Sequence, residues 1–458
     1  MITSLVRRIP NLFGPSNQTF HKKFGLTNQI FIKGQLFTSH MDREKLKQLI
    51  VEQHQVKKSD HTIPRELLST INKFKDTPFI IIISGIRRSG KSTLLHQMRS
   101  GILKDSYYVN FDDERFVHFT IDDFQTLHEL LIEVFGNKNI FIFDEIQNIK
   151  NWERFVRRLN DAGKKIYVTG SNASMLSKEL GTHLTGRHIS FSLYTFSFKE
   201  FLKFKNHSIS SLERLTTEQK SILKKFFNEH LEKGGFPEYL QTDKEEYLKS
   251  LYENILYRDI ITRYNLPNEK IIKEVVYYAV SNIGKEISFN SLRKLTNLTS
   301  ATTIREYFEY LENSYLTFLI SRYNTSVKKQ IYYNKKVYFI DTAMARVLGF
   351  RTSDDLGRML ENIVFLHLKR HNKEIYFHKE KYECDFVIRK GNKIVEAIQV
   401  TQNLQNNKER EINGLLEALD TYKLKEGLIL TADNEEEIIE KKKKITVKPI
   451  WKWLLEQH

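Results

Sequence analysis

The chain has 458 residues, 40% of them hydrophobic, with 72 lysines and arginines against 56 aspartates and glutamates, a formal net charge of +16. This length exceeds the usual size of one hydrophobic core, so we expect two to four domains. No stretch approaches the roughly 18 consecutive apolar residues of a membrane span, and the single cysteine, Cys384, excludes an intramolecular disulfide, which together indicate a cytoplasmic protein without a membrane partner.

The N-terminal 41 residues contain five basic residues and no acidic one. Three interpretations are open: an organellar presequence, translated upstream sequence with Met41 as the functional start, or a disordered basic arm. We expect residues 1–58 to form a basic, poorly ordered extension with a leading helix that contributes nothing to catalysis.

The segment that begins at Gly85 matches the pattern G-x-x-x-x-G-K-[ST] at each fixed position, directly after the apolar run 79–83. Such a site needs a buried strand that aims the loop, glycines that let backbone N–H groups approach phosphate, and a helix N-terminus. Lys91 is expected to reach the β and γ phosphates of ATP, and Ser92 to place its hydroxyl on Mg²⁺. The predicted nucleotide-binding residues are Gly85, Ile86, Arg87, Arg88, Ser89, Gly90, Lys91, Ser92 and Thr93.

A second strand-like run, residues 140–143, ends in two carboxylates. Asp144 is predicted to hold Mg²⁺ opposite Ser92. Glu145 is predicted to orient and deprotonate the attacking water, because hydrolysis needs a base beside the γ phosphate and the loop supplies none. Strands and helices alternate through residues 59–205, which predicts a parallel α/β sheet with nucleotide at the carboxyl ends of its strands.

Polar residues follow a further strand at Thr169, Ser171 and Asn172, where a side chain would reach the γ phosphate; an ordinary turn is the alternative. Arg187 has two interpretations. It either enters the nucleotide site of a neighbouring copy as an arginine finger, which requires a homo-oligomer, or makes a surface ion pair.

Residues 206–275 are expected to form a helical lid and residues 276–345 a winged helix, because two short amphipathic helices joined by a polar turn make a helix-turn-helix pattern. The second helix should pack Ile304 and Phe308 inward and offer Arg305 to a DNA major groove. Such modules also bind proteins, so an unknown protein partner is the alternative.

Strand-like alternation over residues 315–323 and 330–340 predicts the wing. Near the C-terminus, the four lysines of residues 441–444 are expected to be the solvated end of a helix.

Residues 346–458 are expected to form an α/β domain that resembles the PD-(D/E)xK nuclease fold, with Glu361 on an amphipathic helix and Asp385 opening a strand. A working site of this kind holds Mg²⁺ between carboxylates and uses a lysine to help the attacking water. At the usual Glu-x-Lys position this chain has Gln399 and Thr401, a weak Mg²⁺ ligand and a side chain without charge. We therefore predict a degenerate domain retained for DNA or partner binding.

The phosphate-binding loop, the acidic pair, the Thr-Gly-Ser-Asn turn and the Leu-Thr-Gly-Arg segment together resemble a prokaryotic family of AAA-type ATPases fused to a C-terminal nuclease-like domain. The resemblance extends over roughly residues 60–436. It implies hydrolysis of Mg²⁺-bound ATP through Asp144 and Glu145, a sensor at Ser171 or Asn172, and Arg187 as the finger. The expected fold is α/β: an AAA-type P-loop NTPase sheet with a helical lid, a winged helix and a C-terminal nuclease-like domain.

The excess positive charge indicates a polyanionic partner, and we favour DNA because a nucleotide occupies only one small basic site. Solvating lysines without a polyanionic partner are the alternative. The preferred function is an Mg²⁺-dependent ATPase that couples nucleotide state to DNA or partner binding by its C-terminal half. The rival hypotheses are an ATP-regulated, metal-dependent DNA nuclease and a nucleotide-dependent switch that binds proteins without touching DNA.

Overall fold

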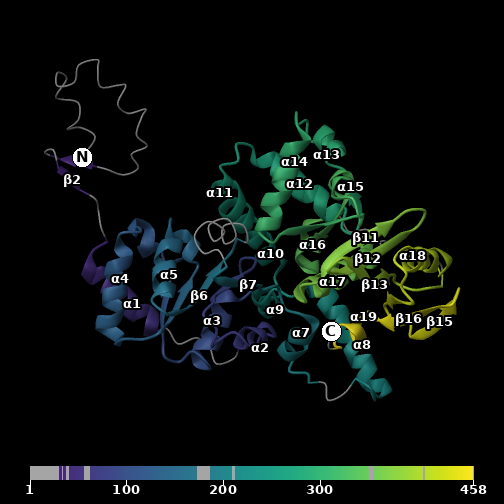
Figure 1. The fold of residues 1–458 in the computed structure, drawn as a ribbon, viewed down its shortest axis with the longest axis horizontal. Helices are drawn as coiled ribbons and strands as arrows, with labels where there is room; N and C mark the ends of the chain where they lie inside the picture. Colours follow the sequence, from purple (N-terminus) through teal and green to yellow (C-terminus); the bar gives the residue numbers. More distant parts are fainter. Residues whose placement is uncertain are drawn as a thin grey trace.

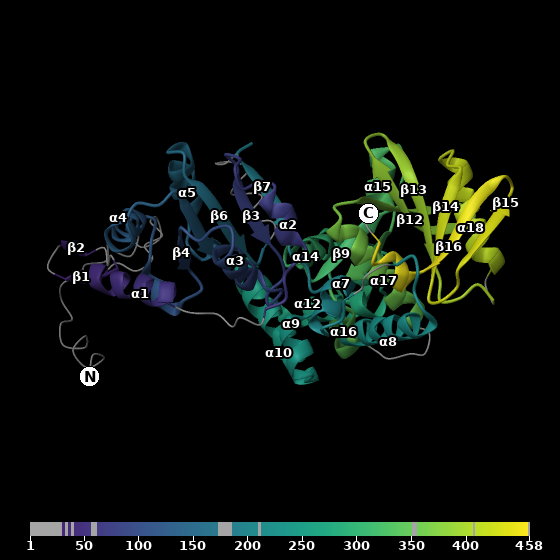
Figure 2. The same cartoon turned by 90° about the horizontal axis from the view of Figure 1, so that it is seen from below.

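The computed structural model describes residues 30–32, 35–37, 41–55, 62–172, 186–208, 212–349, 355–405 and 408–456. Two α/β units lie at opposite ends of the molecule, with a mostly helical middle segment between them (Figures 1 and 2). The prediction for residues 1–29 lies outside the described residues, and β1 (Ile30–Ile32) pairs antiparallel with β2 (Gln35–Phe37). Within the described ranges, no helix is both long and apolar enough to cross a membrane.

A five-stranded parallel sheet of order β4-β5-β6-β3-β7 forms the N-terminal α/β unit and confirms the predicted fold class. The central strand β3 is buried along its whole length, as expected for a parallel sheet covered on both faces. The strands are β3 (Ile80–Ser84), β4 (Ser106–Asn110), β5 (Ile140–Asp144), β6 (Lys165–Gly170) and β7 (His188–Ser192).

Helices cover both faces of this sheet, because successive strand residues point to opposite sides. Ile80 and Ile82 pack in one core and Ile81 and Ile83 in another. The first core contains residues of α1 (Arg43–Gln55), α4 (Asp123–Phe135) and α5 (Trp152–Asp161), so the leading helix α1 packs on this unit. The second core contains residues of α2 (Leu67–Asn72) and α3 (Lys91–Ser100).

The middle segment consists of helices and a small antiparallel sheet of order β8-β10-β9. Ile304 and Phe308 are fully buried, which confirms the inward face predicted for α14. The predicted strand over residues 330–340 was wrong in its first part, because residues up to Tyr332 continue a short helix. The elements are α7 (Phe198–Phe204), α8 (Thr217–Lys233), α9 (Pro237–Thr242), α10 (Glu245–Asn254), the π-helix η5 (Ile255–Ile261), α11 (Thr262–Tyr264), α12 (Glu269–Ser281), β8 (Glu286–Ile287), α13 (Phe289–Leu295), α14 (Ala301–Asn313), β9 (Thr317–Ser321), α15 (Val327–Tyr332), β10 (Lys335–Phe339) and α16 (Thr342–Leu348).

The C-terminal α/β unit is a six-stranded mixed sheet of order β11-β12-β13-β14-β16-β15 with two main helices. The first helix was expected to be amphipathic, but residues 360–368 are buried on all sides. Its elements are α17 (Asp355–Arg370), β11 (Glu374–Lys379), β12 (Glu383–Lys390), β13 (Lys393–Val400), α18 (Lys408–Thr421), β14 (Glu426–Thr431), β15 (Glu436–Glu440), β16 (Lys443–Pro449) and α19 (Ile450–Trp453).

The lysine run is not a helix end, contrary to expectation. It forms the turn and the start of the second strand in a hairpin, in which β15 pairs antiparallel with β16. Lys441 and Lys442 both have positive φ values, 49° and 64°, which is the backbone that a tight two-residue hairpin turn requires. The buried Ile445 and Val447 follow with the period of two that is typical of a strand.

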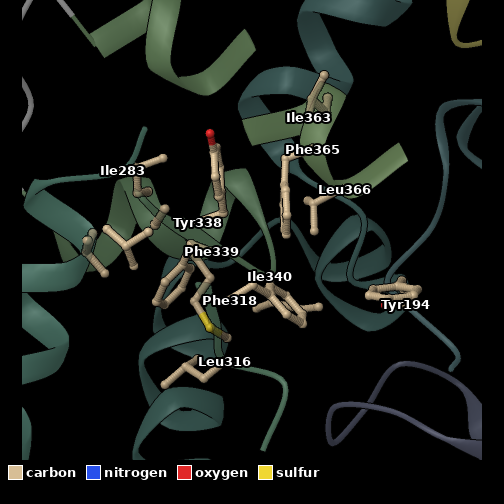
Figure 3. Packing of buried hydrophobic residues seen from close by; sticks show 14 of the residues in the cluster. Tyr194, Ile283, Leu316, Phe318, Tyr338, Phe339, Ile340, Ile363, Phe365 and Leu366 are labelled. Carbon is tan, nitrogen blue, oxygen red and sulfur yellow. The ribbon is translucent and has the colours of Figure 1, made fainter. Parts of the chain in front are cut away.

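One hydrophobic core joins the middle segment to the C-terminal unit. Figure 3 shows its centre, where the ring of Tyr338 from β10 stands parallel to that of Phe365 from α17. Their centroids are 4.2 Å apart with an interplanar angle of 10°. Helix α17 packs against β10 and α8 of the middle segment and against β11 and β13 of its own sheet, which explains why its residues 360–368 are buried on all sides.

Candidate functional site

The phosphate-binding loop runs from the end of β3 to Lys91, the first residue of α3. A Cβ atom at Gly85 would lie 2.2 Å from the carbonyl oxygen of Leu193, so only glycine fits there. Gly90 caps α3 with a φ of +97°, a conformation that other residues rarely adopt. Both glycines thus let the loop fold tightly over the start of the helix, with its N–H groups available to an anion.

Lys91 lies between the loop and the acidic end of β5. Its Nζ donates to the carbonyl oxygens of Gly85 (3.0 Å) and Ile86 (3.3 Å) and forms an ion pair with Glu145 Oε1 at 3.2 Å. The side chain is only 4% exposed. The lysine is thereby held where phosphate oxygens would contact the loop.

Asp144 ends β5 and is completely buried. It accepts hydrogen bonds from Tyr108 (3.0 Å) and from the hydroxyls of Thr169 and Ser92. Burial, together with the nearby charge of Glu145, raises the pKa of Asp144 above its usual value, although the hydroxyl bonds oppose this. A bound divalent cation would reverse that tendency and favour the carboxylate.

Glu145 has the opposite electrostatic environment. Its backbone is left-handed, with a φ of 51°, and its N–H donates to Thr169 Oγ1 at 3.0 Å. Burial alone would raise the pKa of this carboxyl, but the charge of Lys91 and a 2.5 Å hydrogen bond from Gln147 hold it below its usual value. The group is therefore ionised at neutral pH, as a general base must be.

The three polar residues after β6 contact different parts of the molecule. Thr169 contacts the acidic pair, whereas Ser171 donates to Asp259 of η5 at 3.3 Å and Asn172 donates to the hydroxyl of Tyr264 in α11 at 3.3 Å. Because β6 lies between β3 and β5, its end adjoins both the loop and the acidic pair. Ser171 and Asn172 join this edge of the sheet to the middle segment.

A partly buried ion pair links the loop itself to the same π-helix. Arg87 donates to both carboxylate oxygens of Asp259, at 3.0 and 3.1 Å, a bidentate geometry. On the outer side, Arg88 forms an ion pair with Glu238 of α9 at 3.5 Å, and Arg258 one with Asp112 at 3.3 Å.

A cavity of about 580 Å³ opens over the loop, within the usual range for a small-molecule site. Two features fit Mg²⁺-bound ATP: the glycine cradle of the loop, and the Ser92 hydroxyl beside Asp144 as oxygen ligands. A cavity of about 1340 Å³ elsewhere shares none of the loop residues 85–93. The smaller cavity is lined by Arg87, Arg88, Gly90, Lys91, Ser92, Thr93, Asn110, Asp112, Glu145, Pro237, Glu238, Gln241 and Arg258.

Arg187 is not part of this arrangement. It precedes β7, and its carbonyl accepts from the N–H of Ile80 at the amino end of β3, whereas the loop follows the carboxyl end. Its guanidinium pairs with Asp161 of α5, and its side chain is 41% exposed. Within one chain, Arg187 and the loop are thus at opposite ends of the sheet.

Arg65 was missed by the sequence reasoning. Its guanidinium donates to the loop carbonyl of Ser89 at 2.6 Å, to Glu200 at 2.9 Å and to the carbonyl of Tyr194 at 2.7 Å. Arg65 and Glu200 side chains are each only 4% exposed. No local pattern marks Arg65, although the Ser197–Glu200 capping box is readable in the sequence.

The predicted nuclease-like residues are partly brought together in the C-terminal unit. Glu361 and Asp385 both contact Lys336 of β10, at 3.1 and 2.9 Å. Gln399 accepts from the Asp385 N–H at 3.2 Å, whereas the Thr401 hydroxyl donates to the carbonyl of Asn403 and thus bonds away from the carboxylates. Lys336 was not anticipated, because it lies before this domain in the sequence.

A parallel sheet whose glycine-rich loop meets an acidic pair at the strand ends defines a P-loop NTPase domain of the AAA type. Residues 77–202 match the family of AAA domains. Residues 224–355 and 356–453 match two domains of unknown function, DUF8612 and DUF4143.

Two curated relatives match the chain at length. The uncharacterized protein MJ1544 of Methanocaldococcus jannaschii is 36% identical, over 94% of this chain and 100% of the relative. An uncharacterized protein of Haemophilus influenzae is 33% identical, over 78% of this chain and 90% of the relative. The chain belongs to the same family as these proteins.

Solved structures share less sequence identity with this chain than these two relatives do. The Walker-type ATPase PABY2304 of Pyrococcus abyssi has 15% identity and a TM-score of 0.42, with 64% of this chain and 97% of that chain covered. DnaA of Aquifex aeolicus bound to AMPPCP has 14% identity and a TM-score of 0.25, with 54% and 86% covered.

Proposed function

We propose that this protein binds and hydrolyses ATP with Mg²⁺ and uses the nucleotide state to reposition its C-terminal half, which binds DNA. The observation that carries the hydrolytic part is the triad of Lys91, Asp144 and Glu145 around the loop. Lys91 neutralises phosphate charge, Ser92 and Asp144 would hold Mg²⁺, and the ionised Glu145 activates the attacking water. Magnesium would supply charge neutralisation of the transferred phosphoryl group.

The coupling part is supported by polar contacts between the sheet edge and the middle segment. Arg87 and Ser171 both bind Asp259 of η5, so a phosphate that attracts either one competes with the same carboxylate. Asn172 binds Tyr264, whose ring stacks on Tyr310 of α14 with centroids 3.9 Å apart. A change at the γ phosphate can therefore reach α14 through two residues, Asn172 and Tyr264.

A second polar contact joins the end of β3, just before the loop, to the middle segment. The hydroxyl of Tyr315, just after α14, lies 2.5 Å from Ser84 Oγ, the last residue of β3 before the loop. It also lies 3.2 Å from Ser192 Oγ. The carboxyl ends of β3 and of its neighbour β7 are thus tied to the segment that follows α14.

The DNA part is supported by the order of elements around α14. Helix α13, a short turn, α14 and the antiparallel sheet β8-β10-β9 support the proposal of a helix-turn-helix with a wing. Thr302 and Arg305 are exposed on α14 and available to a groove, and the chain carries 16 excess positive charges.

Two substitutions test the hydrolytic part. Lys91→Ala should lose nucleotide affinity, whereas Glu145→Gln should bind ATP normally and hydrolyse it at least about a hundredfold more slowly, because it removes the general base. Lys75→Ala, an exposed lysine of the same unit, serves as the matched control. Normal hydrolysis by both site variants would refute the assignment.

The DNA part is tested separately by fluorescence anisotropy of a labelled duplex with the Glu145→Gln variant, with and without ATP. Even three phosphate contacts should weaken binding by more than about tenfold between 50 and 200 mM salt. Arg305→Ala should lower the affinity. Absence of binding at the lower salt concentration would refute DNA binding and leave the ATPase proposal intact.

A further inference from the structure

An acidic cluster lies where β10 of the middle segment meets the C-terminal unit, and a lysine ammonium lies at its centre. Lys336 Nζ is 2.9 Å from Asp385 Oδ1, 3.1 Å from Glu361 Oε1 and 2.8 Å from Glu383 Oε1. An ammonium has three N–H donors. Three carboxylate partners therefore use its whole hydrogen-bonding capacity.

The cluster is built around this ammonium. The Lys336 side chain is 1% exposed. Glu361 Oε1 also accepts from the Tyr338 hydroxyl at 2.7 Å, and the second oxygen of Asp385 accepts from the Val400 N–H at 2.9 Å. A Cβ atom on Gly284 would lie 2.6 Å from Glu361 Oε2, so a glycine, here with a φ of +72°, makes room for the carboxylate.

The neighbouring carboxyl groups stabilise the charged form of Lys336. Burial would lower the pKa of the ammonium, but the charges of Asp385 and Glu361 raise it well above its usual value. A buried lysine that faces three carboxyl groups thus keeps its proton, in contrast to an isolated buried lysine, which tends to lose it.

A nuclease-like fold implies Mg²⁺ between these same carboxylates, and the residues present do not fit it. The ammonium lies at the point on which Glu361, Glu383 and Asp385 converge. Gln399, the remaining ligand position, donates to Glu411 at 2.5 Å and uses its oxygen for the Asp385 N–H. With Lys336 in place, no group of three or more His, Cys, Asp or Glu side chains among the described residues is arranged to hold a metal.

We propose that Lys336 is the resident cation of this cluster and replaces the metal ion, so that the C-terminal domain folds and works without a divalent cation. The lysine belongs to the segment matched by one family domain and the carboxylates to the segment matched by the next. The same contact thus fastens β10 to α17 and β12. This inference does not depend on ATP hydrolysis.

The proposal predicts a latent metal site. Lys336→Ala removes the ammonium and leaves three hard oxygen ligands around one point, the donor set that Mn²⁺ favours. In the nucleotide-free protein, titration with MnCl₂ followed by the electron paramagnetic resonance signal of free Mn²⁺ should reveal one Mn²⁺ bound per chain of the variant. The affinity should be at least tenfold tighter than for the wild type and should be lost in Lys336→Ala with Asp385→Asn.

Lys335→Ala is the matched control, because Lys335 is the preceding residue of β10 and its Nζ binds Ser321 and the carbonyl of Gln330 instead of carboxylates. It should gain no Mn²⁺ binding. A folded Lys336→Ala variant without Mn²⁺ binding would overturn the proposal.

The wild-type protein provides a test that does not require the variant to fold. Its unfolding temperature should be the same in EDTA and in 1 mM MnCl₂. If the wild type binds Mn²⁺, or unfolds at a higher temperature in MnCl₂, and Asp385→Asn abolishes that effect, a metal binds in this cluster. That result would overturn the proposal.

Discussion

Arg65 allows a quantitative test of how the phosphate-binding loop is supported. Its guanidinium joins the carbonyl of Ser89 to the carboxylate of Glu200, and both side chains of the ion pair are 4% exposed. Burial would raise the pKa of Glu200, but Arg65 and the N–H groups of Ser197 and Glu66 hold it below its usual value. Arg65→Met leaves this buried carboxylate without its counter-ion.

Removal of one partner from a buried ion pair costs about 3–5 kcal/mol. For a unit of 150–250 residues, each kcal/mol lowers the unfolding temperature by roughly 2–4 °C, so we expect a fall of about 10 °C. Thermal unfolding followed by circular dichroism at pH 7 measures it. Adding Glu200→Gln to Arg65→Met should recover part of the loss, because the uncompensated charge is then gone.

Arg115→Met is the matched control. Arg115 also has two carboxylate partners, Glu52 and Asp113, but its side chain is 43% exposed, and exposed ion pairs contribute little. Equal unfolding temperatures for the Arg65 and Arg115 variants would refute the reasoning. The contribution of Glu200 should also disappear in acid. Because its folded-state pKa is lowered, this stability is present above about pH 4.5 and is lost as the pH falls through the folded-state pKa.

Two further predictions concern buried titratable groups. Burial raises the pKa of Glu312 to about 6, so folding favours its protonated form, and stability is lost as the pH rises from 4.5 through 6. Glu312→Gln should therefore be more stable than the wild type by about 2 kcal/mol at pH 8 and nearly equal to it at pH 4.5, as measured by urea unfolding; a constant difference would contradict this. Burial also raises the pKa of the Cys384 thiol, which contacts the carbonyls of Phe386 and Ile398. Ellman's reagent should therefore fail to label the native chain at pH 8 and should label it fully in urea. Rapid labelling of the native chain would contradict the burial of this thiol.

The loop and the acidic pair could be predicted from sequence because their physical requirements are local. Gly85 and Lys91 lie six residues apart, and Asp144 directly ends its own strand. The predicted parallel sheet follows from the same alternation of apolar strands and helices. Local pattern is a less reliable guide where a run of charged residues adjoins a short apolar alternation. The lysine run near Lys441 predicts the end of a helix, although the alternating Ile445 and Val447 that follow are typical of a strand.

The supporting contacts could not be predicted, because their partners are distant in sequence. Arg65 and Glu200 are separated by 135 positions, and Arg87 and Asp259 by 172. Burial of residues 360–368 of α17 likewise depends on contacts with the middle segment and with the C-terminal sheet, which the sequence pattern does not indicate. Lys336 is the clearest case. The predicted nuclease-like domain has no lysine at the usual position, and a lysine from the preceding segment contacts the carboxylates instead.

The nature of the contacts also locates the part of the molecule that is able to move. The middle segment and the C-terminal unit share one apolar core. Among the described residues that precede α7, only Ile86 and Tyr194 of the N-terminal unit belong to this core. The remaining links across this boundary include hydrogen bonds and ion pairs at Asp259, Tyr264 and Tyr315. Polar links exchange partners at lower cost than a packed core deforms, because water or phosphate oxygens replace the lost partner. In the proposed cycle, a γ phosphate that draws Arg87 or Asn172 away would thus move the middle segment and the C-terminal unit together, because they share one core.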